Sequence, residues 1–548
     1  MIGICCNQNE RETVREFFQL FKTPWEFWIL GRYYEVIIST VYETPELKAD
    51  LKIVFSSEPT NLDTIKNTLV DSSSSGYLVD YNGIRLPIYG KLARLRGPGH
   101  PLICGQIDSE VIGIAFSEPP EGILRIGYDL FSEVAFLLSE GQPGEYALIP
   151  TLELHISLLR EWIVRAGIPL VEIPPIPWGY NFIACLTHDV DFAGIRQHKF
   201  DHTMWGFIYR ALVGSFLGFL GGTYPFNQLL KNWIAVLSLP LVYMGIIRDF
   251  WDEFKEYTEI EKDACSTFFL IPFKKRPGDK VQEKLLAQRA TSYDINDVQK
   301  QVHDLINQGF EVGLHGIDAW HDVDKGKQEL NQIVRVIGQN NVGVRMHWLC
   351  FDLSSPAILE EVGFKYDSTF GYNRVIGYRG GTTQVFRPLG VKQLLEVPLH
   401  IQDTAMFIAL ALTSTQAWDL CTKVMNDTAR YGGVMTVLWH MRSLAPERLW
   451  GEFYKHMLHE LRARGAWVSS AGQVVQWFRQ RRSIRFEDSR FENGKLRLWL
   501  KPESQLSQPF MFIRVYNPQD IEFQKRHGED TYKDILYNGD TYLEIPLD

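Results

Sequence analysis

Apolar and polar positions alternate in a characteristic way between residues 182 and 482. Short apolar runs such as FIACL, STFFLIPF and VMTVLW are followed by stretches in which apolar residues recur every three or four positions. Six or more such strand–helix repeats are typical of a parallel α/β architecture. We therefore predict an α/β fold for this region, in its simplest form a (β/α) barrel.

The flanking regions have other patterns. Residues 1–150 mix strand-like runs with an amphipathic helix, which predicts an N-terminal α+β accessory domain. Residues 151–181 begin with a long helix and continue into the Pro-rich stretch VEIPPIPWGY, which reads as a linker. Residues 483–548 contain alternating runs separated by Gly, Pro and Asp, which predicts a small C-terminal all-β domain.

Composition narrows the functional classes and the compartment. The 548-residue chain has a net charge of −10 and no basic tail, which argues against nucleic acid as a partner. Its seven Cys have no repeated spacing, so we do not expect a disulfide framework. This cysteine usage favours a reducing compartment. The start, MIGICCNQNERETVREFF, lacks a basic region and a long apolar core, so no secretory signal is predicted. We expect a cytoplasmic protein. A peripheral contact with the inner face of the membrane is compatible with this location.

Polar, ionisable residues end nearly every predicted strand of the α/β region. In a parallel barrel the carboxyl ends of the strands meet at one rim, so these side chains should converge. Isolated cases have simpler explanations: a turn rich in Asp, a buried core histidine or a surface ion pair of Arg345. The residues concerned are Asp189, Asp191, His315, Arg345, His347, Asp403 and His440.

One Asp and two His make an open three-ligand site for Zn²⁺ or a harder divalent ion. Asp189 and Asp191 lie two residues apart and face the same side of an extended segment, so one can ligate while the other acts as a base. A further His could protonate a leaving amine. This combination of groups indicates an amide hydrolase.

The motif order resembles that of a known family. THDVD, FEVGLH after a helix, a strand bearing Arg345, LLEVPL and VLWH follow one another between residues 182 and 482. This order is similar to that of the polysaccharide deacetylases, the NodB-homology group or carbohydrate esterase family 4, in a branch with THDVD. The resemblance implies a distorted (β/α) barrel of about seven strands. It also implies removal of N-acetyl, and in some members O-acetyl or N-formyl, groups from sugars with a divalent metal, most simply Zn²⁺, with Co²⁺, Ni²⁺ or Mn²⁺ as alternatives.

The resemblance also implies roles for individual residues. Asp189 looks like the catalytic base, Arg345 like the arginine that orients the base and His440 like the general acid. Asp191 and His315 look like the first two metal ligands.

The second metal histidine departs from the family pattern. Where the family has a His four residues after the first, this chain has Ala319. We expect His321, six residues after His315, to replace it, with Asp318 as an alternative donor and an exposed loop histidine as the simpler interpretation. HGIDAWHD also resembles the branch that deformylates or deacetylates sugar-lipids. We assign Asp318, Trp320, His347 and Asp403 to substrate binding.

An insertion at the rim, residues 196–262, separates Asp191 from His315 by more than a hundred positions. Its apolar, aromatic part is interrupted by Arg210, Pro240 and Arg248, so no membrane-spanning helix is expected. One interpretation is a pair of amphipathic helices that pack on the barrel or on the N-terminal domain. The other is a cap whose apolar face, within residues 205–249, meets a membrane or a lipid-linked glycan.

The sequence is compatible with three functional hypotheses. The first is a metal-dependent hydrolase that removes N-acetyl groups from a carbohydrate or lipid-linked sugar in polysaccharide metabolism. The second is a deformylase or another C–N amidase on the same barrel. The third is a catalytically silent glycan-binding module, an idea that the alanine at position 319 favours.

Overall fold

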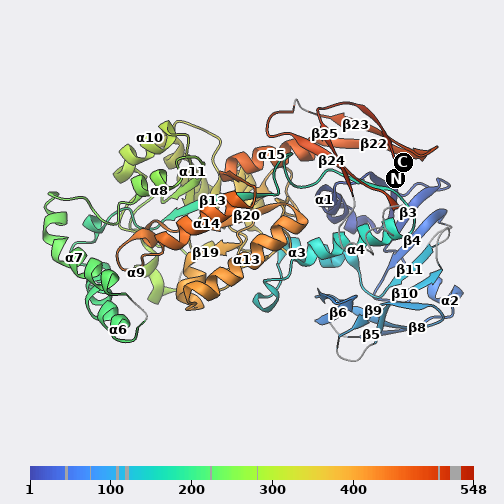
Figure 1. Cartoon of the computed structure of the whole chain (residues 1–548), viewed down its shortest axis with the longest axis horizontal. Coiled ribbons are helices and arrows are strands. Elements are labelled where there is room, and N and C mark those ends of the chain that lie inside the picture. Colours follow the sequence, from blue (N-terminus) through green and yellow to red (C-terminus); the bar gives the residue numbers. More distant parts are fainter. Residues whose placement is uncertain are drawn as a thin grey trace.

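The computed structural model describes residues 1–42, 47–73, 76–106, 110–117, 122–222, 225–280, 282–503, 506–518 and 532–547. The molecule is elongated, with a mixed sheet at one end, a curved parallel sheet in the middle and a pair of helices at the other end (Figure 1). The two chain termini lie close together at the end that holds the mixed sheet.

The central sheet is parallel throughout, as the strand–helix alternation predicts. Its eight strands follow the order β18-β17-β16-β15-β14-β13-β20-β19, and a ninth, β21, pairs with β13. The outer strands β18 and β19 form no ladder with each other within the described residues, so the sheet is a curved, open version of the expected barrel. The strands are β13 (Phe182–Val190), β14 (Thr267–Leu270), β15 (Glu311–Gly316), β16 (Val344–Met346), β17 (Tyr366–Asp367), β18 (Leu395–Glu396), β19 (Ile401–Gln402), β20 (Val434–Leu438) and β21 (Ala466–Ser469).

Helices connect these strands and bury one apolar face against the sheet. In α11 (Val323–Ile337), Asp322 accepts the backbone N–H of Lys325 at the start, and Gly338, with φ of 71°, ends the helix in a left-handed conformation. A large core between sheet and helices includes Trp439, Leu359 and Ile333. The remaining helices are α8 (Phe254–Ile260), α9 (Leu286–Arg289), α10 (Gln299–Asn307), α12 (Ser355–Val362), α13 (Ser414–Tyr431), α14 (Gly451–Ala463) and α15 (Ala471–Ser483).

The N-terminal region forms a second sheet with its own core. Nine strands take the order β2-β1-β3-β4-β11-β10-β9-β6-β7, and β5 pairs with β8 beside them. Helix α4 (Thr151–Arg165) packs into this core through Leu158 and Trp162, although its sequence was grouped with the linker. The other elements are β1 (Ile2–Cys5), α1 (Arg11–Phe21), β2 (Trp25–Phe27), β3 (Tyr34–Ser39), β4 (Ala49–Phe55), α2 (Asn61–Ile65), β5 (Leu69–Ser73), β6 (Tyr77–Tyr81), β7 (Ile84–Ile88), β8 (Leu92–Arg96), β9 (His100–Gly105), β10 (Val111–Ser117), β11 (Gly122–Ile126) and α3 (Leu130–Ser139).

Two small sheets contain the C-terminal strands. One has the order β22-β23-β26, and in the other β12 (Leu170–Glu172) pairs with β24, which pairs with β25. Part of the expected linker is thus a strand. Arg481 of α15, fully buried, donates hydrogen bonds to the carbonyls of Leu20 and Ile173, and so ties α15 to the N-terminal region and to the segment that follows β12. The C-terminal strands are β22 (Ile484–Glu492), β23 (Lys495–Pro502), β24 (Met511–Tyr516), β25 (Lys533–Tyr537) and β26 (Tyr542–Pro546).

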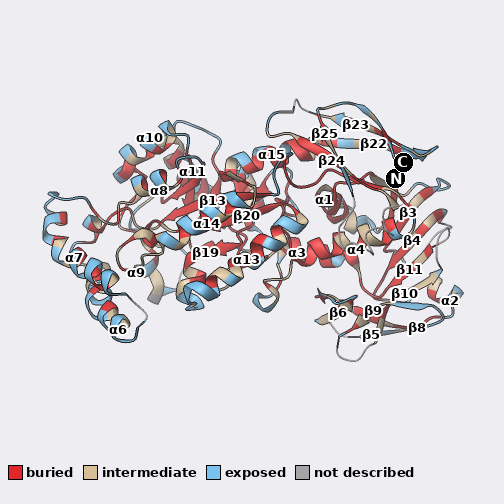
Figure 2. Cartoon of the chain, viewed as in Figure 1, coloured by how far each residue is buried: buried red, intermediate tan, exposed pale blue. Residues whose placement is uncertain are grey.

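The rim insertion forms a helical hairpin. Its first arm runs continuously through α5 (His202–Tyr209), the π-helical turn η4 (Arg210–Gly214) and α6 (Ser215–Leu220). Its second arm is α7 (Phe226–Tyr243). The two arms share a small core that includes Phe207, Ala235 and Leu239. The hairpin projects from the parallel sheet at the end of the molecule away from the N-terminal sheet, and exposed residues cover most of its outer surface (Figure 2).

Candidate active site

Strand β13 delivers alternate side chains to two different environments. Thr187, Asp189 and Asp191 point to one side, as the period of an extended strand requires. His188, between them, points to the other side, where Nδ1 lies 2.8 Å from the carbonyl of Trp439 and Nε2 lies 2.9 Å from Glu261. His188 is therefore a fully buried structural residue that anchors the strand to Glu261, which directly follows α8.

Asp191, His315 and His347 form a group that could hold a metal ion. Their ligand atoms all lie within 4.8 Å of one another. Oδ1 of Asp191 lies 3.3 Å from Nε2 of His315 and 3.3 Å from Nε2 of His347. This oxygen is buried and has no hydrogen-bond partner among the described residues, which is unusual for a carboxylate and is the arrangement expected of a ligand atom.

The protonation states suit the same use. Burial lowers the pKa of His347 to about 3, so its imidazole is neutral at physiological pH and has a free lone pair. Nδ1 of His315 lies 3.0 Å from the carbonyl of Arg345, which leaves Nε2 facing Asp191. Burial opposes ionisation of Asp191, but the neighbouring imidazoles outweigh it and hold its pKa well below the usual value. One carboxylate and two imidazoles fit Zn²⁺ or a similar divalent ion and leave room for further ligands.

Asp189 lies beside this group and is held by Arg345. Nη1 of Arg345 lies 3.1 Å from Oδ1 of Asp189 and 2.7 Å from Oγ1 of Thr187. The other guanidinium nitrogens donate to the carbonyl and the hydroxyl of Ser368, at 2.8 Å and 2.7 Å. Arg345 is fully buried, so the surface ion pair considered as its simpler explanation does not apply. Oδ2 of Asp189 lies 3.7 Å from Nε2 of His315, so this carboxylate borders the metal group.

His440 reaches the same group from the end of β20. Its Nε2 lies 3.8 Å from Oδ2 of Asp191, and its Nδ1 lies 2.6 Å from Oδ1 of Asp403. Burial favours the neutral imidazole, but Asp403 and Asp191 outweigh it and raise the pKa of His440 to about 9. Asp403 is fully buried and also accepts a hydrogen bond from Ser443. It therefore contacts His440 rather than a free surface where substrate could bind.

The loop after β15 differs from the sequence expectation. His321 is not in the metal group; its Nε2 lies 3.0 Å from Oδ1 of Asp318. Asp318 is engaged by this contact and by the backbone N–H of Asp279, so it is not a free donor for the metal either. The turn is fixed because Glu329 of α11 accepts the backbone N–H groups of Ile317 and Asp318, at 2.9 Å and 2.7 Å.

Ala319 stands at the position where the polysaccharide deacetylases have their second histidine, and it packs against a helix. Ala319 is fully buried against α11, whose Gly326 lies so close that an added Cβ would sit 3.3 Å from Ala319. His321 is not an exposed loop histidine, because only 8% of its side chain is accessible. Its ring stacks edge-on with Trp320, and the ammonium of Lys280 lies over the Trp320 ring. Asp318, Trp320 and His321 thus interact mainly with one another and with nearby loop residues.

His347 takes the position that the sequence assigned to His321. It follows β16, which pairs with β15 so that Arg345 is directly opposite His315. The signal in the sequence was its location two residues after Arg345 at a strand end. Thr187 lies within β13 and Ser368 directly follows β17, and both hold Arg345, but nothing in the sequence alone links either of them to an arginine on another strand.

A cavity of about 270 Å³ opens beside the metal group. Asp191 and His347 line one part of it, and Arg210 of the helical hairpin and Arg442 line another. The cavity therefore extends from the metal group to the first arm of the rim insertion.

The similarity of this chain to known proteins is weak. No family model matches the chain, and no curated protein matches it. A solved structure of a candidate polysaccharide deacetylase from Mycobacterium smegmatis is 18% identical, with 58% of this chain and 98% of that chain covered and a TM-score of 0.36. Puue allantoinase is 11% identical over 56% and 92%, with a TM-score of 0.35. A pseudoenzyme of carbohydrate esterase family 4 from Bacillus anthracis is 11% identical over 56% and 70%, with a TM-score of 0.26. Similarities this weak assign no activity to the chain.

Proposed function

We propose that this chain is a metal-dependent hydrolase that removes an N-acetyl group from a carbohydrate. The observation that carries the proposal is that two ion pairs adjoin the group that could hold a metal. Asp189 pairs with Arg345, and His440 pairs with Asp403. The order of the sequence motifs that contain most of these residues, which resembles that of the polysaccharide deacetylases, also supports the proposal. The metal would be held by Asp191, His315 and His347, with Zn²⁺ the simplest choice for one carboxylate and two imidazoles.

The reaction would be hydrolysis of an amide by water. A bound divalent ion would lower the pKa of a water molecule and polarise the amide carbonyl. Asp189, fixed in position by its hydrogen bond from Arg345, would accept the proton of the attacking water. The C–N bond then breaks, and protonated His440 donates its proton to the leaving nitrogen. The products are acetate and the free amine of the sugar.

Asp403 has a supporting role in this proposal. It accepts from Nδ1 of His440 and from the backbone N–H of the same residue, at 2.6 Å and 2.8 Å. This fixes the orientation of the ring and keeps Nε2 protonated until the proton is needed.

We also place the protein in a reducing compartment, the cytoplasm. All seven cysteines are free thiols, and three of them are buried.

The test is release of acetate from N-acetylated chitooligosaccharides by protein loaded with Zn²⁺, Co²⁺, Ni²⁺ or Mn²⁺. We expect release with the wild type and loss of at least about 100-fold in Asp189→Asn, with the bound metal retained. His321→Ala is the matched control, since this histidine lies outside the metal group, and its activity should remain near that of the wild type. Release of formate from N-formylated sugars, with no acetate, would instead indicate a deformylase. A protein that binds none of these metals and releases neither acid would be a silent glycan-binding module.

A further inference from the structure

The helical hairpin carries an apolar surface on the side that faces away from its own core. On α7 the buried residues, such as Leu229, Ala235 and Leu239, lie on one face. The opposite face is a continuous stripe of exposed apolar side chains, spaced by three or four residues as one helix face requires. The stripe contains Phe226, Leu230, Trp233, Ile234, Leu237 and Leu241.

The first arm has the same organisation. Met204, Phe207 and Ala211 are buried, whereas the outer face is apolar and exposed. Both arms therefore pack through one apolar face and present a second apolar face to the surroundings. The outer face includes Trp205, Tyr209, Phe216, Leu217 and Leu220. Exposed apolar surface of this extent on one element is typical of a site for a membrane or another protein.

The charge of the hairpin favours a lipid surface. The chain as a whole has a net charge of −10, yet residues 202–248 contain no Asp or Glu. Their charged residues, histidine aside, are the three cations Arg210, Lys231 and Arg248. Arg210 and Lys231 lie on the two arms, whereas Arg248 lies beyond α7 and pairs with Glu253. A basic, aromatic and apolar helix pair within an acidic protein complements a bilayer that contains anionic lipids.

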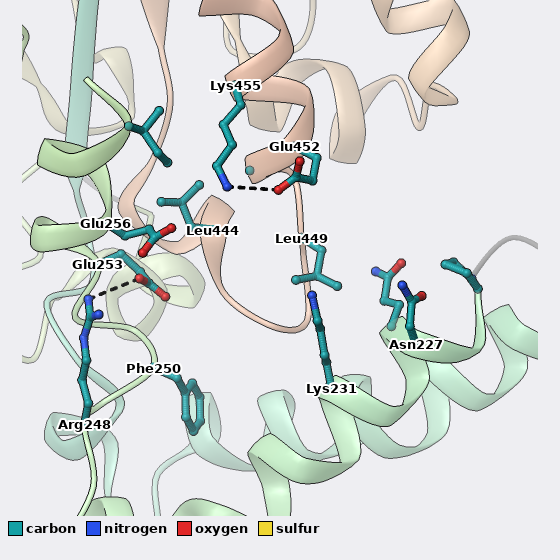
Figure 3. A pocket seen from close by; sticks show the side chains of 14 residues that line it. Asn227, Lys231, Arg248, Phe250, Glu253, Glu256, Leu444, Leu449, Glu452 and Lys455 are labelled. Carbon is teal, nitrogen blue, oxygen red and sulfur yellow. Dashed lines mark hydrogen bonds and ion pairs between the residues drawn. The ribbon is translucent and has the colours of Figure 1, made fainter. Parts of the chain in front are cut away.

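The polar side of α7 fixes the orientation of the hairpin. Asn227, Gln228 and Lys231 face a groove of about 590 Å³, on whose other wall lie Glu452 and Lys455 of α14 (Figure 3). The polar face of α7 thus lies toward the rest of the protein, and its exposed apolar stripe points away from it.

Length and charge argue for a helix pair lying in the interface rather than across the bilayer. Residues 202–220 are the one segment, within the described parts of the chain, that is long and apolar enough to span a membrane by length and composition. At about 1.5 Å per residue it would just reach across, but Arg210 lies near its middle. Arg210 also lines the cavity beside the metal group, which requires that this part of the arm stay with the protein.

We propose that the hairpin α5–α7 binds the surface of an anionic lipid bilayer, with both exposed stripes inserted at the level of the headgroups and upper acyl chains. The cavity that joins Arg210 to Asp191 and His347 would then open next to the bilayer surface. Binding is a property of the hairpin alone and does not depend on the proposed reaction.

The test is flotation of the full-length protein with vesicles. Vesicles of equal parts phosphatidylcholine and phosphatidylglycerol should carry the protein at low salt, and vesicles of phosphatidylcholine alone should carry much less. Leu237→Asp, on the stripe of α7, should reduce the bound fraction at least about tenfold, because a charge then enters the apolar contact. Leu30→Asp is a matched control: both leucines are 79% exposed, but Leu30 lies far away in the N-terminal region.

Several outcomes would overturn the proposal. They are failure of the wild type to float with anionic vesicles, equal loss in both leucine variants, and equal binding to phosphatidylcholine alone. A dimer in lipid-free solution that Leu237→Asp dissociates would identify the stripe as a contact between two copies of the chain. Asp189→Asn should float like the wild type, so a failure of the proposed catalytic function leaves this result unaffected.

Discussion

Asp403 holds His440 at two points: its Oδ1 lies 2.6 Å from Nδ1 of the ring, and its Oδ2 accepts the backbone N–H at 2.8 Å. Both residues are almost entirely enclosed, so this contact is little screened by solvent. It has the geometry of a carboxylate that orients a histidine and stabilises its protonated form. Asp403 therefore sets both the orientation and the protonation of His440.

The first prediction follows from this pair. Asp403→Asn removes the charge that most strongly raises the pKa of His440, so the imidazolium should lose its proton at a lower pH. In the wild type, activity that needs protonated His440 is present below its pKa of about 9 and is lost as the pH rises through that value. We expect kcat to fall by about 100-fold and the alkaline limb of its pH profile to move toward neutrality. An unchanged limb in the variant would show that His440 is not the group that titrates.

The second prediction separates the two histidines that compete for the metal site. His347→Ala removes one of three ligands and should weaken Zn²⁺ binding by about 100-fold or more. His321→Ala should leave the affinity almost unchanged, because that ring contacts Asp318 instead. Metal content after dialysis and calorimetric titration measure the difference. A larger loss of Zn²⁺ affinity in His321→Ala than in His347→Ala would identify His321 as the ligand.

The third prediction concerns the buried pair of Arg345 and Asp189. Arg345→Met leaves a carboxylate buried without its cation and should reduce the free energy of unfolding by about 3 to 5 kcal/mol. Adding Asp189→Asn removes the unpaired charge and should restore much of that loss. Denaturant unfolding of the two single variants and the double variant gives the coupling between the residues. Additive effects would mean that the pair is not coupled.

The fourth prediction concerns acid stability through His400. Its Nδ1 accepts the backbone N–H of Thr436, its Nε2 lies 3.1 Å from the carbonyl of Thr382, and burial lowers its pKa from 6.5 to about 4. The unfolded chain binds this proton more readily. The contribution to stability is therefore complete above pH 6.5 and is lost as the pH falls from 6.5 toward 4. The difference corresponds to about 3 kcal/mol.

His400→Gln tests this directly. A glutamine can make comparable hydrogen bonds but does not titrate, so the midpoint of thermal unfolding should depend less on pH below 6.5 than in the wild type. His198→Gln is the comparison at a second buried histidine, since burial lowers the pKa of His198 while Asp201 opposes the change. The same pH dependence in His400→Gln and the wild type would remove His400 from the explanation.

The sequence alone determined the parallel α/β region and the set of ionisable residues at its strand ends. Both follow from local patterns: the hydrophobic period gives strands and helices, and parallel strands bring their carboxyl ends to one edge. Asp189 and Asp191 on one side of β13, with His315 nearby, could be expected on these grounds, and the structure brings them together.

Only the tertiary structure decided which histidine joins them. Distance along the chain favoured His321, six residues after His315, but the pairing of β15 with β16 places His347 beside Asp191. Buried Ala319 and the carboxylate of Glu329 turn the loop so that His321 contacts Asp318. The exposure of the hairpin was also undecided, because amphipathic helices look alike in sequence whether their second apolar face is covered or not. Local patterns determine which faces are apolar, whereas contacts between distant segments determine which of those faces are buried.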